Sequence, residues 1–592
     1  MKRIGIVLFL LTLQVSAQQP TPGAIQGIVV SGETGSPLAK ATVDVLPPTG
    51  TIPLYSTRSN ADGRFFIPDI RPGTYRLAAV RPGYVKTEYG QRISGGPSLD
   101  LVVAPGQRLA DIRLPLILGA VVSGRVTDKG QPVGIADVVA MKPVYNDGQT
   151  TMVPVLTDRT NDLGEYHIYW LPPGRYHIVA VVWDTASRVP YYISPEGTDD
   201  GASFYTERRS GRAVLNRAIG SGAADNEAHV PIYFPGTPDP ERASVVDVKP
   251  GSDIRNIDIQ ADALITRRVR GRITGVPPVN ANGQPVNPQV GMLPLTSSFV
   301  TGIANAPVDA SGAFDIQRVV PGRYVLYALA RGSVGNVTGR ALVDVNTEDV
   351  NGVIVNLTPT IELSGRIVVE RQTPIAGPDP ALPVLGVVLR PDPMIAGVPT
   401  GTSTPLPDGT FKYPTGANAP PLQTGNYRVI VNPILRPAVS PGETPPNIPT
   451  SLRNAYVKSI RFGNDDVLNG GLRVTGSTQD ELVITIGTNP GSLEGRVVNG
   501  AGQPVRAATV VLIPEGGLKF RVDHRFAFSD AGGGFQIQGV PPGDYQVYAF
   551  EQIERGDWQD PRAMSGFEGR GKPVHIDEGG KGSLDVVSIP PS

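Results

Sequence analysis

Hydrophobic residues recur at every second position in short runs along this chain, and residues 60–75 show the pattern clearly. Phe65 and Ile67 are spaced like the inward positions of a half-buried strand, and residues 75–79 alternate again after a turn. Proline presets φ at the second position of a turn, and glycine supplies the positive φ that a type II turn needs next. We therefore expect a type II turn at Pro72-Gly73, between two predicted strands.

The same unit occurs five times. Its turn glycine and its second glycine lie ten residues apart in four copies and sixteen apart in the remaining copy, which indicates a six-residue insertion there. A tyrosine follows the second glycine in every copy. The three positions are Gly63, Gly73 and Tyr75; Gly164, Gly174 and Tyr176; Gly312, Gly322 and Tyr324; Gly409, Gly425 and Tyr427; and Gly533, Gly543 and Tyr545.

An opening strand precedes each copy and a closing strand follows it, so each copy supplies about seven short strands, as in an immunoglobulin-like sandwich. The opening strands carry glycine at positions 27, 124, 271, 365 and 495, so successive copies start 97, 147, 94 and 130 residues apart. These intervals have the size of domains rather than of solenoid repeats.

The sequence therefore predicts an all-β fold, a tandem array of about five seven-stranded Greek-key β-sandwich domains of the immunoglobulin or prealbumin type. Repeat two carries a long insertion at 184–229, and repeat four carries a proline-rich insertion at 433–449. The predicted segments are a signal peptide at 1–17 and repeats one to five at 18–118, 119–263, 264–360, 361–489 and 490–592.

The order of these positions resembles the carboxypeptidase regulatory-like domain. The shared pattern is Gly-x-Val, Pro-x-x-x-Ala-x-Val, Asp-x-x-Gly-x-Phe-x-Ile and Pro-Gly-x-Tyr. Repeats one, two and five match it well, repeat three partly, and repeat four mainly through residues 407–411 and 425–427. Residues 456–461 and 540–545 also resemble the large secreted proteins of this type found in soil bacteria. The resemblance implies a prealbumin-like sandwich, similar to the starch-binding-domain-like fold, with an accessory role and no implied reaction.

Composition narrows the classes of partner. Gly 70 and Pro 59 in 592 residues make a turn-rich chain, and charged residues are only 18%. The formal net charge is −1 and no long run of one sign occurs, so the sequence predicts no nucleic-acid partner and no anionic membrane partner. There is no cysteine, which excludes disulfides and a lipidated cysteine within this sequence.

The first residues have the features of a secretory signal. Lys2 and Arg3 precede an apolar run at 4–13, and small residues lead to a cleavage site after Ala17. We expect the mature chain to begin at Gln18 and to be periplasmic, outer-surface-associated or extracellular. No later stretch is long and apolar enough to predict a transmembrane segment.

Motifs for catalysis and metal binding are weak. His575 and Glu578 form a His-x-x-Glu pair, but no histidine follows that could supply a third zinc ligand, and a closing strand explains the segment better. The sequence has no nucleophile elbow, phosphate-binding loop or dinucleotide fingerprint. We predict that the protein is not an enzyme, with no catalytic residues, no metal site and no cofactor.

Aromatic residues outside the repeat pattern are the candidate binding residues. An aromatic face can stack on a sugar ring while polar neighbours bind its hydroxyl groups. The leading hypothesis is a secreted, non-enzymatic scaffold or adhesion-like binding protein, expected to be a monomer, with polysaccharide or another envelope protein as partner. The alternative is a carbohydrate-binding protein that uses aromatics of repeats two and five. Its candidate contacts are Trp183, Tyr191, Tyr192, Tyr205 and Trp558.

Overall fold

The computed structural model describes most of the chain between residues 21 and 591. The described residues are 21–591 apart from 49, 97, 147–148, 183–189, 193–226, 281, 296–298, 302–303, 334, 372–376, 378, 393–400, 416–421, 433–448, 450–451, 453–454, 477–478, 516–524 and 555. The predicted signal peptide and cleavage site lie outside these residues. Among the described residues, no helix is long and apolar enough to cross a membrane.

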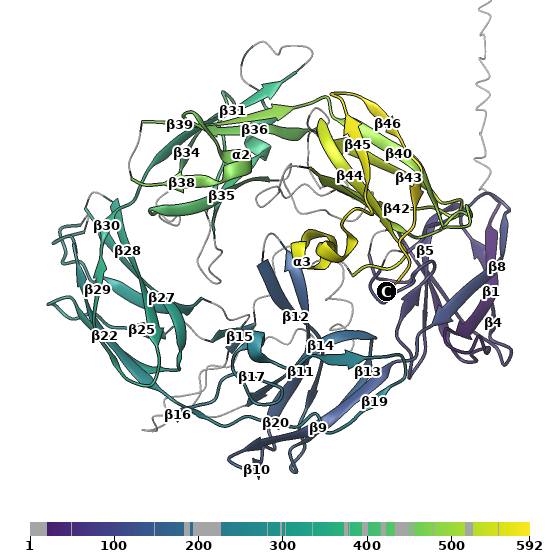
Figure 1. Ribbon diagram of the computed structural model, residues 1–592, viewed down its shortest axis with the longest axis horizontal. Helices are drawn as coiled ribbons and strands as arrows, with labels where there is room; N and C mark the ends of the chain where they lie inside the picture. Colours follow the sequence, from purple (N-terminus) through teal and green to yellow (C-terminus); the bar gives the residue numbers. More distant parts are fainter. Residues whose placement is uncertain are drawn as a thin grey trace, which may run out of the picture. The chain divides into compact units, whose positions relative to one another are not determined.

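Residues 21–91 and 98–118, which make up most of the described part of repeat one, belong to one compact unit, and the other described residues belong to a second. In repeat one the opening strand β1 lies between β4, which is antiparallel to it, and β8, which is parallel to it (Figure 1). The first sheet consists of β4 (Arg64–Ile70), β1 (Gly23–Ser31) and β8 (Arg108–Leu116). The second consists of β3 (Tyr55–Arg58), β2 (Thr42–Leu46), β5 (Gly73–Val80), β6 (Thr87–Glu88) and β7 (Leu101–Val103).

Repeat two repeats this plan with longer strands in its second sheet. Its first sheet contains β9 (Ala120–Asp128), β10 (Gln131–Pro132), β13 (Glu165–Leu171), β19 (Asp253–Ile254) and β20 (Ile259–Gln260). Its second contains β11 (Ala136–Asn146), β12 (Gln149–Arg159), β14 (Gly174–Val182), β17 (Ile232–Tyr233) and β18 (Val246–Val248). The remaining elements are β15 (Pro190–Tyr192), β16 (Glu227–Ala228) and the 3-10 helix η1 (Pro240–Arg242).

Repeat three has the same pairing around its opening strand β22. Its first sheet contains β22 (Arg267–Thr274), β26 (Ala313–Val319) and β29 (Val350–Asn356). Its second contains β23 (Gln289–Pro294), β25 (Ala304–Ala306), β27 (Gly322–Gly332), β28 (Gly335–Val345) and β30 (Thr358–Pro359). Two short strands, β21 (Leu264–Ile265) and β24 (Phe299–Thr301), pair with β16 and β15.

Repeats four and five complete the array. In repeat four one sheet contains β31 (Leu363–Glu370), β34 (Thr410–Tyr413), β36 (Tyr456–Phe462), β37 (Asp465–Asp466) and β39 (Glu481–Gly487), and the other contains β32 (Gly386–Pro391), β33 (Thr402–Ser403), β35 (Gly425–Asn432) and β38 (Leu472–Val474). Its short helices are η2 (Leu382–Val384) and α2 (Val467–Gly470).

In repeat five one sheet contains β40 (Gly491–Val498), β43 (Gly534–Val540), β46 (Lys581–Ser583) and β47 (Val586–Val587), and the other contains β41 (Thr509–Pro514), β42 (Arg525–Phe528), β44 (Gly543–Phe550) and β45 (Lys572–Ile576). Its short helices are η4 (Asp557–Gln559), α3 (Pro561–Met564) and η5 (Ser565–Phe567). Each repeat buries a core of its own between two sheets. The predicted all-β array of β-sandwiches is confirmed.

The glycine of each opening strand is required by packing. It pairs across the sheet with the aromatic residue of the hairpin strand, as Gly27 does with Phe65 and Gly495 with Phe535. A Cβ at Gly27 would lie 2.0 Å from the carbonyl oxygen of Ile112, and at Gly495 1.8 Å from that of Leu584. Real Cβ atoms never come so close, so only glycine lets the ring and the closing strand meet here.

The repeated tyrosine has the structural role of a tyrosine corner. In all five repeats its hydroxyl donates a hydrogen bond to the carbonyl oxygen four residues earlier, over 2.6–2.9 Å. Its ring belongs to the core of its own repeat. The recurrence of this tyrosine is therefore explained by folding, and it needs no ligand.

The predicted type II turn at the second glycine is wrong. The φ angles of Gly174, Gly425 and Gly543 are about 150°, far from the value near +80° that such a turn requires. These glycines instead begin strands β14, β35 and β44. The left-handed residue comes earlier, in a bulge at the end of the hairpin strand. It is Asp69, Trp170, Arg318 or Gly539, with φ angles of 56°, 62°, 60° and 69°.

We predict that Gly495→Ala destabilises repeat five by about 3 kcal/mol, because the new methyl group overlaps the backbone of the closing strand. Gly500→Ala is the matched control, since a Cβ there meets nothing within 4 Å. Hydrogen exchange of the β40 and β43 amides in the full chain measures both. Equal protection in the two variants would contradict this account of the glycine.

Candidate functional site

The candidate site is an open groove on repeat five, with a volume of about 730 Å³. It lies over the outer face of β40 and β43, beside the segment that leads from β46 to β47. Its lining is mostly polar and includes two phenylalanines, Phe528 and the core residue Phe535. The residues that define it are Glu494, Arg496, Phe528, Asp530, Gln536 and Asp585.

Strand alternation places these side chains on the outer face. Leu493 and Val497 are buried in the core, so Glu494 and Arg496 between them face outward. Gln536 lies outward for the same reason, between the buried Phe535 and Ile537. The polar groups of the groove therefore stand on two hydrogen-bonded strands, whose backbone fixes their spacing.

Two of the groove's carboxylates also hold the backbone. Asp530 accepts hydrogen bonds from the N–H groups of Gly532 and Gly534, both at 2.8 Å, and so shapes the turn before β43. Asp585 accepts one from the N–H of Arg496 at 3.1 Å. Each carboxylate has further lone pairs for hydroxyl or amide donors. The groove therefore offers carboxylate, guanidinium and amide groups to a polar, hydrogen-bonding ligand.

An aromatic cluster covers the outer face of the other sheet of repeat five. Trp558 stands in η4 and packs against Phe526 with ring centroids 5.4 Å apart, and Phe550 packs against Phe567 at 5.1 Å. Trp558 is only 5% exposed, and its indole N–H is buried with no hydrogen-bond partner. Its ring fills the interior of this cluster, so a sugar could reach it only if residues 551–571 moved. Its role as a sugar contact stays a prediction.

The other predicted sugar contacts belong to the insertion of repeat two. Trp183 and Tyr205 lie outside the described residues. Tyr191 and Tyr192 have a described backbone in β15, which pairs antiparallel with β24 of repeat three, while their side chains lie outside the description. Their roles also remain predictions.

The His-x-x-Glu pair does not form a common site. His575 Nδ1 lies 2.6 Å from Asp544 Oδ1, and this hydrogen bond raises the histidine pKa. Glu578 instead lies 3.6 Å from Lys458 Nζ. Within the described ranges, no group of three or more His, Cys, Asp or Glu residues could hold a metal ion.

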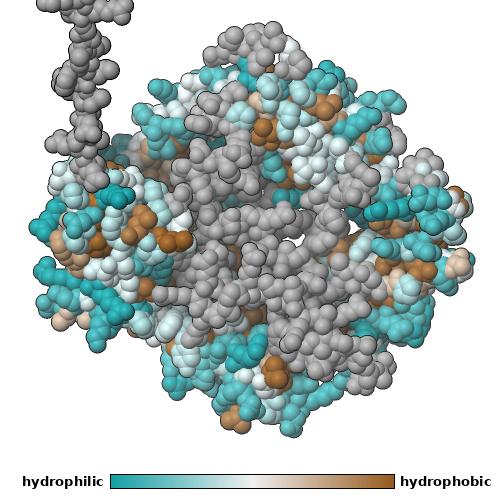
Figure 2. Space-filling view, turned by 180° about the vertical axis from the view of Figure 1, so that it is seen from behind, coloured by the Kyte–Doolittle hydropathy of each residue, from teal (hydrophilic) through white to brown (hydrophobic). Residues whose placement is uncertain are grey.

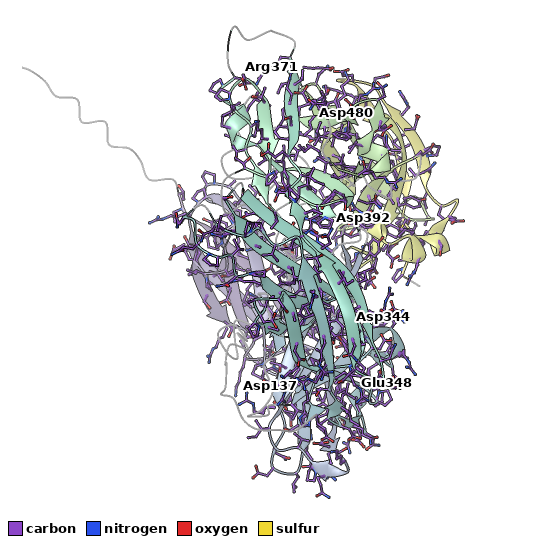
Figure 3. The ribbon with its side chains drawn as sticks, turned by 90° about the vertical axis from the view of Figure 1, so that its left-hand side faces the viewer. Asp137, Asp344, Glu348, Arg371, Asp392 and Asp480 are labelled. Carbon is purple, nitrogen blue, oxygen red and sulfur yellow. The ribbon has the colours of Figure 1, made fainter. Side chains whose placement is uncertain are left out.

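Elsewhere, some charged side chains form ion pairs within their own repeat. Asp137 pairs with Arg159 at 2.9 Å, and Asp344 pairs with Arg323 at 3.3 Å. Both acids are labelled in Figure 3, together with Glu348, Asp392 and Asp480, and they come from three different repeats. On the face shown in Figure 2 the coloured surface is mostly hydrophilic, with hydrophobic residues singly or in small groups.

The fold defines a tandem β-sandwich repeat protein. The sequence pattern of the carboxypeptidase regulatory-like domain matches residues 24–114 and 492–587, about a third of the chain. This match confirms the resemblance for repeats one and five. No curated protein sequence matches the chain.

Three of the solved structures with detectable similarity are the following. The Bacillus anthracis TIE protein is 13% identical, with a TM-score of 0.15, and the match covers 57% of this chain and 51% of that protein. The minor pilin of Streptococcus agalactiae is 11% identical, with a TM-score of 0.19 and coverage of 41% and 96%. Two B repeat units of the collagen-binding protein of Staphylococcus aureus are 9% identical, with a TM-score of 0.12 and coverage of 79% and 100%. At such scores these likenesses carry no argument about function.

Asp557 is the described acid with the most perturbed pKa. Burial beside Trp558, followed by the carboxylates of Glu554 and Asp560, raises its pKa to about 6. A raised carboxyl pKa means that the folded state binds the proton more tightly than the unfolded state. The stability that comes from this tighter proton binding is fully present below about pH 4 and is lost as the pH rises through about 6.

We predict that Asp557→Asn stabilises repeat five at pH 7.5 by about 1–2 kcal/mol, a value reduced for the partial exposure of the group. The gain should be smaller at pH 4.5, where the native carboxyl is already protonated. Urea unfolding followed through tryptophan fluorescence at both pH values measures the effect. A gain of equal size at the two pH values would contradict the assignment.

Proposed function

We propose that the chain is a secreted, non-enzymatic protein that serves as a scaffold or adhesion-like binding protein at the cell envelope or outside the cell. The observation that supports this most is the use of the recurring residues. The opening glycine, the hairpin ring and the corner tyrosine all hold the sandwiches together. The residues that bind a partner are then those that differ between repeats, and the rigid sheets hold their side chains at the surface.

Carbohydrate binding is the second candidate, and the groove of repeat five favours it. Phe528 places an aromatic ring beside the carboxylates and the amide of the groove. An apolar ring face next to hydrogen-bonding groups is the combination that a sugar ring requires. An envelope protein remains the other proposed partner, and the proposed state of the chain is a monomer.

Cell fractionation tests the location. We expect the native protein in the periplasmic, outer-surface or extracellular fraction, and we expect its N-terminal sequence to begin at Gln18, because the signal would be removed after Ala17. A variant with Leu10→Arg, which interrupts the apolar run, should remain in the cytoplasm. Cytoplasmic recovery of the native protein would refute the proposal, whatever its binding properties.

A further inference from the structure

The outer positions of the hairpin strand distinguish repeat two from its sister repeats. Strands β4, β13, β26 and β43 align without gaps, and in each one three positions near the end face away from the core. In repeat two all three are aromatic, whereas the three repeats compared with it have one aromatic residue among their nine positions, Phe66 of repeat one. The three positions are Phe66, Pro68 and Asp69 in repeat one; His167, Tyr169 and Trp170 in repeat two; Asp315, Gln317 and Arg318 in repeat three; and Gln536, Gln538 and Gly539 in repeat five.

Trp170 occupies a backbone position that suits it poorly. Its φ is 62°, in the left-handed region, where glycine, asparagine and aspartate are favoured and a bulky side chain costs conformational free energy. Repeats one and five have Asp69 and Gly539 at this bulge. The fold therefore demands the conformation but not the tryptophan. The indole does not fill the core in return, because it is 43% exposed.

We use the name aromatic platform for the exposed side chains of His167, Tyr169 and Trp170 on strand β13, at the edge of the first sheet. His167 and Tyr169 are stacked, with centroids 5.8 Å apart and planes 14° from parallel, and Tyr169 is 47% exposed. Between Tyr169 and Leu171 the pairing with β9 shifts by one residue, so Trp170 is the extra residue of the bulge. It therefore leaves the inward side that simple alternation would give it.

Polar groups stand across the sheet from the rings. Strand β9 runs between β13 and β19 (Figure 1), with Tyr169 and Asp253 both paired with Val121. Two strand spacings separate the rings from Asp253, about 10 Å. Asp253 accepts a hydrogen bond from Arg255 Nε at 2.9 Å, and this pair lowers the pKa of Asp253, so the carboxylate is ionised at neutral pH.

This arrangement favours a sugar over an apolar protein surface. The platform is one strand wide, and ion pairs flank it on both sides: Arg255 with Asp253, and Arg125 with Glu165 at 3.0 Å. An apolar partner wide enough for a stable interface would cover these charges and remove their water. A sugar ring stacks on an aromatic face through its C–H groups and offers hydroxyl groups to the ion pairs.

We propose that the outer face of repeat two, formed by His167, Tyr169 and Trp170 opposite Asp253 and Arg255, is a glycan-binding site. The site deepens the carbohydrate-binding candidate of the proposed function and rests on that candidate. Tyr169 and Trp170 provide the stacking surface. His167 stacks against the ring of Tyr169. The Asp253–Arg255 pair binds sugar hydroxyl groups. None of the aromatics predicted from the sequence as sugar contacts takes part.

Affinity electrophoresis of the full chain tests the site, with native gels that contain starch, xylan, hydroxyethyl cellulose, laminarin or glycol chitin. We expect at least one polysaccharide to retard the native protein. Tyr169→Ala and Trp170→Asp should each weaken the retardation about tenfold, as the loss of one stacking ring does. Trp170→Asp is the sharper variant, because aspartate already occupies this bulge as Asp69 and should leave the folding of repeat two intact.

Leu163→Asp is the matched control. Leu163 lies in the turn before β13 and is 59% exposed, so this variant removes an exposed apolar side chain from the same repeat without touching the platform. We expect it to bind like the native protein.

Tryptophan fluorescence provides an independent measurement. A sugar stacked on the exposed indole should change the native emission, and Trp170→Phe should abolish this change while it keeps binding, because it preserves an aromatic ring. Failure of all five polysaccharides to retard the native protein would overturn the proposal, as would unchanged retardation of Tyr169→Ala and Trp170→Asp. Neither result bears on cell location, so failure here is distinguishable from failure of the scaffold function, which fractionation tests.

Discussion

The close approach of three strands at the opening glycine is the constraint on which each repeat depends. The hairpin ring lies over the glycine while the closing strand passes beside it, so the first, middle and last parts of a repeat meet at one point. In repeat two a tyrosine replaces the phenylalanine, and its hydroxyl donates to the carbonyl oxygen of Ile257 in the closing strand at 2.7 Å. A contact that joins segments so distant in sequence can form only in the folded sandwich, which explains why its residues recur.

This constraint separates folding from function in the sequence. The opening glycine and the aromatic ring of the hairpin strand pack inside a sandwich, and the corner tyrosine donates a hydrogen bond to the backbone of its own repeat. The outward-facing positions of the same strands have no such structural role, and the residue types at these positions differ between repeats. A rigid sheet that repeats five times can therefore present different chemistry on each copy without risk to the fold.

The fold could be predicted from the sequence because its determinants are local. Turn glycines, alternation and the corner tyrosine recur at fixed offsets, and they specify strands wherever they occur. The surroundings of Trp558 could not be predicted, because η4, α3 and η5 pack over the outer face of the sheet, and no periodicity in the sequence indicates this. The outward position of Trp170 could not be predicted from strand alternation, for a different reason. Alternation from Tyr166 and Ile168 assigns Trp170 to the core, and only the bulge reverses this.

A signal for that reversal was nevertheless present in the sequence. The aligned residues Asp69 and Arg318 are charged, and a charged side chain does not face a sandwich core at this depth without a partner. Comparison of the copies therefore places the position outside the core in every repeat, Trp170 included. The Trp170 side chain is 43% exposed there, and its backbone bears the cost of a left-handed conformation. A ligand that stacks on the exposed part of the ring would supply a functional reason for tryptophan at this position.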